Sequence, residues 1–401
     1  MKKILLSLFA LLALNSLFAK DLYQEADEET RNIIVRTDNL INKKLYAAAW
    51  DLVSGEENEY ILAKKTEIAI YYFAQSMMHQ LFAFKDLKFD ETLYDVRNSE
   101  GPFSLVVFNP ADRINKYVAE HGEKAILDFA LGMYYEDVLE RYGDDWIIPR
   151  EELEKNVLDY LKKAYDQGYY DDYSLSVLAS AIYRTEDYMT ALEIYAVKEE
   201  EYEFTGTDNY HTGIALWMLD QGEEGVEYVK KSIDLYADEP EYQSDSYIVV
   251  ARIYIDIGQY EEAKKYLDLC HEKFPSDYRY QQYSVQLHAA QNQTAKAVEY
   301  GLELFAMAPT NPTVCQLIMK VCNYVNKEDV AIEFFKSAVK KYKKDNEAMA
   351  NLYFHYAYEY SIMENYNQAK KMAGEARKYF EKSNSMTEEI DGLLKEIEEG
   401  N

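Results

Sequence analysis

The sequence contains little glycine, little proline and few cysteines. Its 401 residues include 15 glycines, 7 prolines and 3 cysteines. Proteins rich in tight β-turns need more glycine and proline, so the composition argues against an all-β fold. The cysteines are odd in number, and Cys315 and Cys322 fall within one predicted helix. We therefore expect buried thiols at these positions and at Cys270, although an oxidising compartment would allow one disulfide.

Motifs that carry chemistry are also missing. The sequence contains no HExxH zinc motif, no GxSxG nucleophile motif, no phosphate-binding glycine loop and no calcium loop. The six histidines are scattered, and none stands four residues from another. We therefore predict that the protein is not an enzyme and that it holds no cofactor and no metal ion.

Positive charge is scarce as well. The chain has 43 Lys and Arg against 72 Asp and Glu, a formal net charge of −29. Such an excess repels nucleic acid phosphates and anionic lipid surfaces, so no nucleic acid partner is expected. The simplest alternative meaning of this charge is solubility.

The first residues are typical of a secretory signal. Lys2 and Lys3 precede a run from Ile4 to Leu14 that is apolar apart from Ser7, and the residues that follow can present a cleavage site after Ala19. The run is shorter than the ~20 residues that a membrane span needs. We expect residues 1–19 to be a signal peptide of an exported bacterial protein, periplasmic or extracellular, with no membrane span after cleavage. An uncleaved anchor is the alternative.

A repeat becomes visible in Ser244–Asp277. Apolar residues at helical spacing mark two helices separated by Gly258, and Pro275 ends the second helix. The first helix carries Tyr247, Val250, Ala251 and Tyr254, and the second carries Tyr260, Ala263, Leu267 and Cys270. Small residues such as Ala251 and Ala263 allow two antiparallel helices to approach closely.

This pattern resembles the tetratricopeptide repeat, a helix pair of 34 residues. The segments Tyr278–Asn311 and Pro312–Asp345 follow in phase, and Ala350–Ser383 follows after a four-residue shift. Asp172–Thr205 and Gly206–Glu239 precede them with the same pattern. The resemblance implies an all-α protein, a tetratricopeptide-type α-solenoid in which helix pairs form a right-handed superhelix, with six repeats over residues 172–383.

The remaining chain departs from the repeat. Residues 123–171 form an expanded helix pair with a long turn, and residues 384–401 contain a helix that caps the last repeat. Residues 20–122 form a divergent helical N-terminal region, with helices expected near 25–52 and 59–87. The run Gly101–Pro110 is strand-like, and we favour an extended loop over a strand there.

The resemblance also implies a binding face. In this family the first helix of each pair lines the concave side of the superhelix, through its second, fifth, ninth, twelfth and thirteenth positions. Over the six repeats these thirty positions hold four basic residues and two acidic ones, Asp245 and Asp256, so they are less acidic than the chain. The candidate partner-binding residues are Tyr173, Tyr183, Arg184, Tyr210, Trp217, Arg252, Arg279, Gln282, Gln286, Lys320, Tyr324 and Tyr358.

Aromatic rings and amide side chains suit an extended peptide, whose side chains pack on the rings. We therefore predict a protein-interaction or assembly scaffold that binds a protein segment in the concave groove. An alternative is that these aromatic residues only pack between helices. A second is a glycan-binding surface protein with exposed Tyr and Trp rings, and a third is a small catalytic element within residues 20–122. The partner and the oligomeric state stay open.

Overall fold

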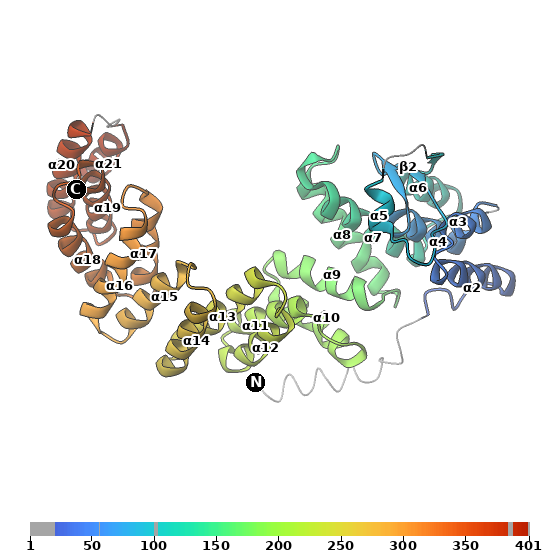
Figure 1. Cartoon of the computed structure of the whole chain (residues 1–401), viewed down its shortest axis with the longest axis horizontal. Helices are drawn as coiled ribbons and strands as arrows, with labels where there is room; N and C mark the ends of the chain where they lie inside the picture. Colours follow the sequence, from blue (N-terminus) through green and yellow to red (C-terminus); the bar gives the residue numbers. More distant parts are fainter. Residues whose placement is uncertain (1–20, 56, 100–102, 384–387, 400–401) are drawn as a thin grey trace. The chain divides into compact units, whose positions relative to one another are not determined.

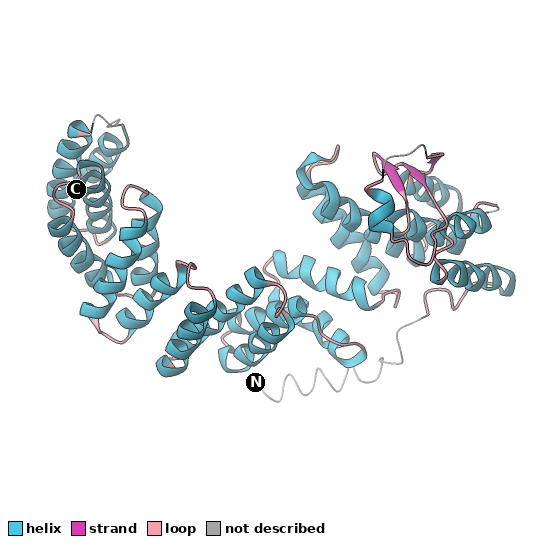
Figure 2. Cartoon of the chain, viewed as in Figure 1, coloured by secondary structure: helices cyan, strands magenta, loops and turns pink. Residues whose placement is uncertain are grey.

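The computed structural model describes residues 21–55, 57–99, 103–383 and 388–399. The predicted signal peptide, residues 1–19, lies outside them. The chain divides into two compact units, residues 1–204 and 205–401. Twenty α-helices within the described residues form almost all of the regular structure (Figures 1 and 2). The predicted helical class is thus confirmed, with one small exception near the N-terminus.

The N-terminal unit is built on one continuous apolar core that extends from Ile34 to Tyr195. Its helices are α2 (Glu28–Asn42), α3 (Tyr46–Val53), α4 (Glu59–Tyr71), α5 (Leu93–Arg97), α6 (Pro110–His121), α7 (Ala125–Tyr142), α8 (Arg150–Tyr165), α9 (Asp172–Arg184) and α10 (Tyr188–Glu201), and a short 3-10 turn, η1, covers Gly143–Asp145. The expected helix pair of residues 123–171 corresponds to α7 and α8, and α9 with α10 forms the first regular repeat.

A small antiparallel sheet interrupts the helices of this unit (Figure 2). Strand β1 (Gln75–Met77) pairs with β2 (Leu81–Ala83), and β2 pairs with β3 (Val106–Val107). The predicted helix over 59–87 is therefore wrong beyond Tyr71, and the predicted loop at 101–110 is wrong at β3. Residues 101 and 102 of that run lie outside the described part.

Two tertiary features explain why α4 ends where it does. Arg97 of α5 donates hydrogen bonds to the carbonyl oxygens of Tyr71 at 2.9 Å and Phe73 at 3.1 Å, which the end of the helix leaves without intrahelical partners. The hairpin then turns through Met78 and His79, which have positive φ angles of 51° and 50°. Glycine or asparagine usually marks such a turn, so Met-His gave no signal in the sequence.

The C-terminal unit is a stack of helix pairs closed by one further helix. Its helices are α11 (Gly206–Met218), α12 (Gly222–Leu235), α13 (Pro240–Asp256), α14 (Tyr260–Lys273), α15 (Arg279–Ala290), α16 (Thr294–Met307), α17 (Pro312–Tyr324), α18 (Glu328–Lys341), α19 (Asn346–Ile362), α20 (Tyr366–Lys382) and α21 (Glu388–Glu399). Each first helix contacts the next first helix from α13 to α19, and the second helices α16 and α18 also touch. The pairs therefore stack in register.

The spacing of the repeats is interrupted twice. The second helices begin 34 residues apart, except that α14 and α20 begin 38 residues after α12 and α18. At both places the first helix has 17 residues instead of the 13 found in α11 and α17. Four residues are about one turn of helix, so α13 and α19 each carry one additional turn at their N-terminal end.

The helices of the second repeat approach most closely at two glycines. A Cβ atom on Gly225 of α12 would stand 2.4 Å from the carbonyl oxygen of Gly213 in α11, and one on Gly213 would stand 2.4 Å from a methyl group of Val229. Real Cβ atoms do not occupy such positions, so only glycine permits this crossing.

We expect Gly225→Ala to lower the free energy of unfolding by about 1–3 kcal/mol, because the clash is with backbone that cannot rotate away. Thermal unfolding followed by circular dichroism measures the effect. Gly374→Ala in α20 is the matched control, since nothing lies within 4 Å of its added Cβ. That control should be neutral or stabilising by up to about 1 kcal/mol, because alanine favours helix. Equal effects of the two substitutions would contradict the close approach.

Helix α21 packs on α19 and α20, the helices of the last repeat. Ile390, Leu393 and Ile397 follow one another at helical spacing and are at most 5% exposed. They join the apolar core formed by α19 and α20. The three cysteines are buried and unpaired, which confirms the expectation of buried thiols.

Candidate functional site

The predicted binding residues lie on the first helices of the repeats. Tyr173, Tyr183 and Arg184 belong to α9 in the N-terminal unit, and the others belong to α11, α13, α15, α17 and α19 in the C-terminal unit. We call the surface of these five helices the first-helix face. The exposed candidates are Tyr173, Arg184, Lys320, Tyr324 and Tyr358; the half-buried ones are Tyr183, Tyr210, Arg252 and Arg279; the buried ones are Trp217, Gln282 and Gln286.

The two glutamines lie on α15, which packs between α13 and α17. Gln282 is 5% exposed and Gln286 is 3% exposed. Their side chains therefore contribute to packing between helices, and a partner would touch the aromatic and charged candidates around them.

Four consecutive first helices meet in one cluster on this face. The Trp217 indole donates a hydrogen bond to Asp256 Oδ2 at 2.9 Å, and the Tyr324 hydroxyl donates to the same oxygen at 2.8 Å. The Arg252 guanidinium lies 5.0 Å from the Trp217 ring centroid and 5.3 Å from that of Tyr283. We call these five residues the aromatic cluster.

Partial burial affects the ionisation of Asp256 and Tyr324 in the aromatic cluster. It raises the pKa of Asp256 above its usual value, although the hydrogen bonds from Tyr324 and Trp217 and the charge of Arg252 act in the opposite direction. Burial and the bond to Asp256 raise the pKa of Tyr324 to about 12. The Tyr324 hydroxyl therefore keeps its proton at neutral pH and acts as a hydrogen-bond donor. The cluster presents aromatic rings, one cation and one carboxylate.

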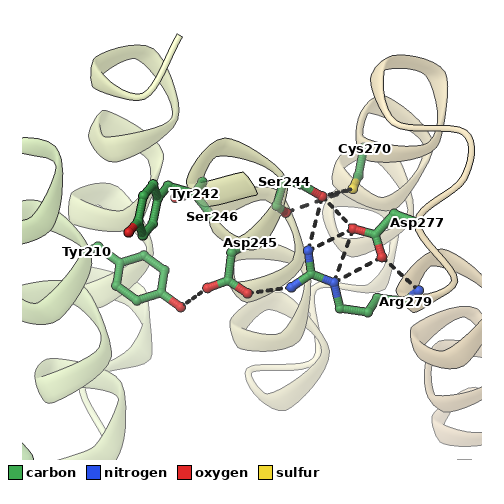
Figure 3. A network of polar contacts seen from close by, with 8 residues as sticks. All are labelled: Tyr210, Tyr242, Ser244, Asp245, Ser246, Cys270, Asp277 and Arg279. Carbon is green, nitrogen blue, oxygen red and sulfur yellow. Dashed lines mark hydrogen bonds and ion pairs between the residues drawn. The ribbon is translucent and has the colours of Figure 1, made fainter. Parts of the chain in front are cut away.

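A second network lies on the same face, between α11, α13 and α15 (Figure 3). Tyr210 donates a hydrogen bond to Asp245, whose other oxygen lies 2.5 Å from Arg279 Nη1. Arg279 also binds Asp277 at 2.7 Å, and Ser244 donates to Asp277 Oδ2 at 2.5 Å. Burial opposes ionisation of Asp277, but the bonds from Arg279 and Ser244 outweigh it and lower its pKa. The arginine is thus held in place by two carboxylates.

Two pockets open beside the additional helical turns. One has a volume of about 650 Å³ and is lined by Glu241 and Tyr242 of the α13 turn, together with Tyr278 and Arg279. The other has a volume of about 330 Å³ and is lined by Glu347 of the α19 turn among other residues. Tyr242 is 59% exposed and Tyr278 is 47% exposed, so the first pocket presents two open rings.

The candidates of the N-terminal unit lie beside a carboxylate of unusual ionisation. Burial and the nearby Glu140 raise the pKa of Glu136 to about 7, while Arg184 acts in the opposite direction. Glu140 also lies against Tyr173. Arg184 therefore favours the charged form of Glu136.

The comparisons with known proteins concern fold only. Neither models of protein families nor curated proteins match the chain. Solved structures similar to parts of it include a tetratricopeptide repeat protein from Parabacteroides merdae, with 17% identity, a TM-score of 0.41, and coverage of 66% of this chain and 98% of that one. The C-terminal part of a TPR repeat-containing protein from Cytophaga hutchinsonii has 13% identity, a TM-score of 0.41, and coverage of 65% and 99%. YrrB, described as a TPR protein with an unusual peptide-binding site, has 13% identity, a TM-score of 0.38, and coverage of 56% and 97%.

The structure itself decides the type of repeat. Its helix pairs recur at 34 residues, with two additions of one turn, and first helices pack on first helices. The repeats are of the tetratricopeptide type. Helices α13 and α19 begin at Pro240 and Asn346, four residues before the predicted repeats Ser244–Asp277 and Ala350–Ser383. The sequence showed Asp256 only as one of two acidic residues, although it joins Trp217 to Tyr324. The four additional residues in the repeat spacing at α13 and α19 were the sequence feature that could have indicated the two pockets.

Outside the tetratricopeptide repeats, the side chains of a serine, a histidine and an aspartate contact one another in the order found in the Ser-His-Asp triads of hydrolases. Ser76 Oγ is 3.4 Å from His79 Nδ1, and His79 Nε2 is 2.7 Å from Asp137 Oδ2. The His79 side chain, however, is 0% exposed and is surrounded by the rings of Phe82 and Tyr134. A substrate cannot reach this histidine, so we interpret the arrangement as part of the core.

Among the described residues, no group of three or more His, Cys, Asp or Glu side chains is placed to hold a metal ion. None of the described helices is both long enough and apolar enough to cross a membrane.

Proposed function

We propose that this protein is an exported bacterial scaffold whose first-helix face binds an extended segment of a protein partner. The aromatic cluster carries the proposal. Trp217, Arg252 and Tyr324 were predicted separately from their repeat positions, and they lie together although they come from three different helices. Aromatic and arginine side chains dominate the energetics of protein interfaces, and Tyr324 is 56% exposed at the edge of this cluster.

Charge supports the same face. Arg252, Arg279 and Lys320 lie on first helices of a chain whose net charge is −29. This face therefore repels a negatively charged partner less strongly than the rest of the protein surface does. The arrangement of residues 1–19 supports export to the bacterial envelope, and no catalytic role is proposed.

A pull-down from envelope extracts of the source bacterium tests the function. Trp217→Ala combined with Arg252→Ala should reduce the recovery of specific partners by about tenfold or more, because both residues are removed from one contact surface. Tyr228→Ala combined with Lys231→Ala is the matched control, since this pair forms the same kind of contact, at 4.5 Å, on the second helix α12. Its recovery should not change.

Trp217 is 9% exposed, so its loss also affects packing. Lys320→Ala combined with Tyr358→Ala removes two exposed residues of the same face and leaves the core intact. This variant should lose partners as well. If both first-helix variants recover the same partners as the unmodified protein, the proposal is wrong.

A glycan is the second candidate ligand, and the 650 Å³ pocket favours it. Tyr242 and Tyr278 present open rings there, beside Asp245 and Arg279, and sugars stack on rings and bind carboxylates and guanidinium groups. Binding to a glycan array that is abolished by Tyr242→Ala with Tyr278→Ala would establish this function. Absence of any glycan binding, with capture of proteins intact, would exclude it.

A further inference from the structure

A small pocket lies at the C-terminal end of the repeats. Its walls come from the start of α17, the additional turn and middle of α19, the end of α20 and the start of α21. The volume of about 330 Å³ is at the lower end of ligand sites, which span about 300–1,000 Å³, so it suits one side chain. The described residues that line it include no lysine and no arginine.

The polar atoms around this pocket are mainly hydrogen-bond acceptors. Glu347 and Glu389 contribute exposed carboxylates. Asn351 is 8% exposed, and its Nδ2 donates to the carbonyl oxygens of Pro309 at 2.9 Å and Asn311 at 3.3 Å. The orientation of the amide is thereby fixed, and Asn351 Oδ1 is buried without a partner among the described residues. An unpaired buried acceptor destabilises the fold, and a hydrogen-bond donor from a ligand would relieve that cost.

His355 adds another acceptor. It is 2% exposed, and its Nδ1 lies 3.0 Å from the backbone oxygen of Asn351. A carbonyl oxygen can only accept, so Nδ1 carries the proton. Burial lowers the pKa of His355 below its usual value, so the ring is neutral at pH 7 and Nε2 keeps a lone pair. The histidine therefore favours a ligand that donates hydrogen bonds.

Two aromatic rings complete the lining. Phe354 and Phe380 stand edge to face, with ring centroids 6.3 Å apart and an interplanar angle of 83°. The face of a phenylalanine ring attracts cations, and most strongly where water is excluded. Rings, carboxylates and neutral acceptors in one pocket are complementary to a positively charged group.

We propose that this pocket binds the guanidinium group of an arginine side chain presented by the partner's extended segment. Arginine has five N–H donors in one plane, stacks on aromatic rings and can donate two parallel hydrogen bonds to one carboxylate. The lysine ammonium, in contrast, is compact and strongly hydrated. A carboxylate or phosphate ligand would be repelled by Glu347 and Glu389. The inference rests on the proposed function and names the chemistry of one residue of the partner.

Isothermal titration of the full chain with a short peptide tests the proposal. The probe is acetyl-Gly-Ser-Arg-Ser-Gly-amide, and the reference peptide carries citrulline, a neutral isostere, in place of arginine. At about 150 mM salt, where exposed charges are screened beyond ~8 Å, the citrulline peptide should bind about tenfold more weakly or not at all. Equal binding of the two peptides, or no binding of the arginine peptide, would overturn the proposal.

Variants place the binding in this pocket. Glu347→Gln combined with Glu389→Gln should weaken the arginine peptide about tenfold or more, because both carboxylates are removed. The control is Glu272→Gln combined with Glu364→Gln, two exposed residues outside the pocket that change the net charge equally. If the control weakens binding as much as the pocket variant, general charge attracts the peptide and the site is wrong.

The proposed function and this inference fail in different ways. In one outcome the Trp217 and Arg252 variant loses partner capture, but the chain shows no preference for the arginine peptide over the citrulline peptide. This outcome would support the scaffold function and overturn the arginine pocket. Arginine-specific binding that depends on Glu347 and Glu389, with partner capture unaffected by the first-helix variants, would support the pocket and overturn the binding face.

Discussion

Asp137→Ala is expected to lower the free energy of unfolding of the N-terminal unit by about 1.5–3 kcal/mol, because a buried imidazole loses its hydrogen bond to a charged group. Asp137 is 8% exposed on α7, and its two carboxylate oxygens share the single Nε–H of Arg141, each at 2.9 Å from the nitrogen. Its Oδ2 also lies 2.7 Å from His79 Nε2 in the hairpin. Removing the carboxylate leaves a fully buried imidazole without its partner.

The consequences extend beyond the pair, because Arg141 and Arg97 both stack on Phe73, at 5.1 Å and 4.0 Å from the ring centroid. The loss of Asp137 frees Arg141, and the β1–β2 hairpin loses its anchor on α7. Hydrogen exchange measured by mass spectrometry should therefore rise in peptides covering residues 75–83 and 125–142 and stay unchanged in α13 and α14.

Asp159→Ala is the control for this prediction. Asp159 is an exposed carboxylate on α8 of the same unit. Surface substitutions usually change stability by less than about 0.5 kcal/mol. Urea unfolding followed by circular dichroism should therefore separate the two variants clearly. If Asp137→Ala behaves like Asp159→Ala, the cluster around His79 does not stabilise the unit.

Glu359→Gln is expected to stabilise the protein at pH 8 by about 3 kcal/mol and to have little effect at pH 5. Glu359 lies on α19 and is 0% exposed, and its Oε1 is buried without a partner among the described residues. Asn323 Nδ2 donates to Oε2 at 3.3 Å. Burial raises the pKa of Glu359 from 4.5 to about 7, the bond from Asn323 opposes the shift, and Glu328 adds to it.

The sign follows from proton binding. Between pH 4.5 and about 7 the folded chain holds a proton on Glu359 that the unfolded chain has released. Stability therefore falls as the pH rises through this window, and the loss is complete above pH 7. Glutamine is uncharged at every pH, so the variant avoids the loss.

The measurement is the difference in the free energy of unfolding between variant and unmodified protein, from urea titrations at pH 5, 6, 7 and 8. Taking the difference removes the contribution of other titrating groups, such as Glu136, whose pKa is also raised to about 7. Glu272→Gln, at an exposed position on α14, should show no pH-dependent difference. A Glu359→Gln difference that is the same at pH 5 and pH 8 would contradict the prediction.

The helix pairs were predictable because their signal is local. Ala251 and Ala263 mark the seam of one pair, and both are 0% exposed in the structure. Turn residues such as Gly258, with a φ angle of 76°, and Pro275 place the ends of the helices. The 34-residue recurrence then gives the number and order of the pairs.

The candidate site was predictable only in part. Repeat positions brought Trp217, Arg252 and Tyr324 to one surface, as expected from the resemblance. The repeat positions did not predict that Gln282 and Gln286 are buried, because burial on α15 depends on the helices on both sides. The role of Asp256 as their common acceptor depends on distances between side chains of different repeats.

From the sequence we could predict the helical class, the 34-residue recurrence, the buried thiols and a candidate binding face, because each depends on spacing within a few helical turns. The end of α4, the hairpin through Met78 and His79, and the pockets beside the additional turns of α13 and α19 became apparent only in the folded chain. These features depend on contacts between residues far apart in the chain, such as Arg97 with Tyr71 and Asp137 with His79. A local pattern of apolar residues does not predict such contacts.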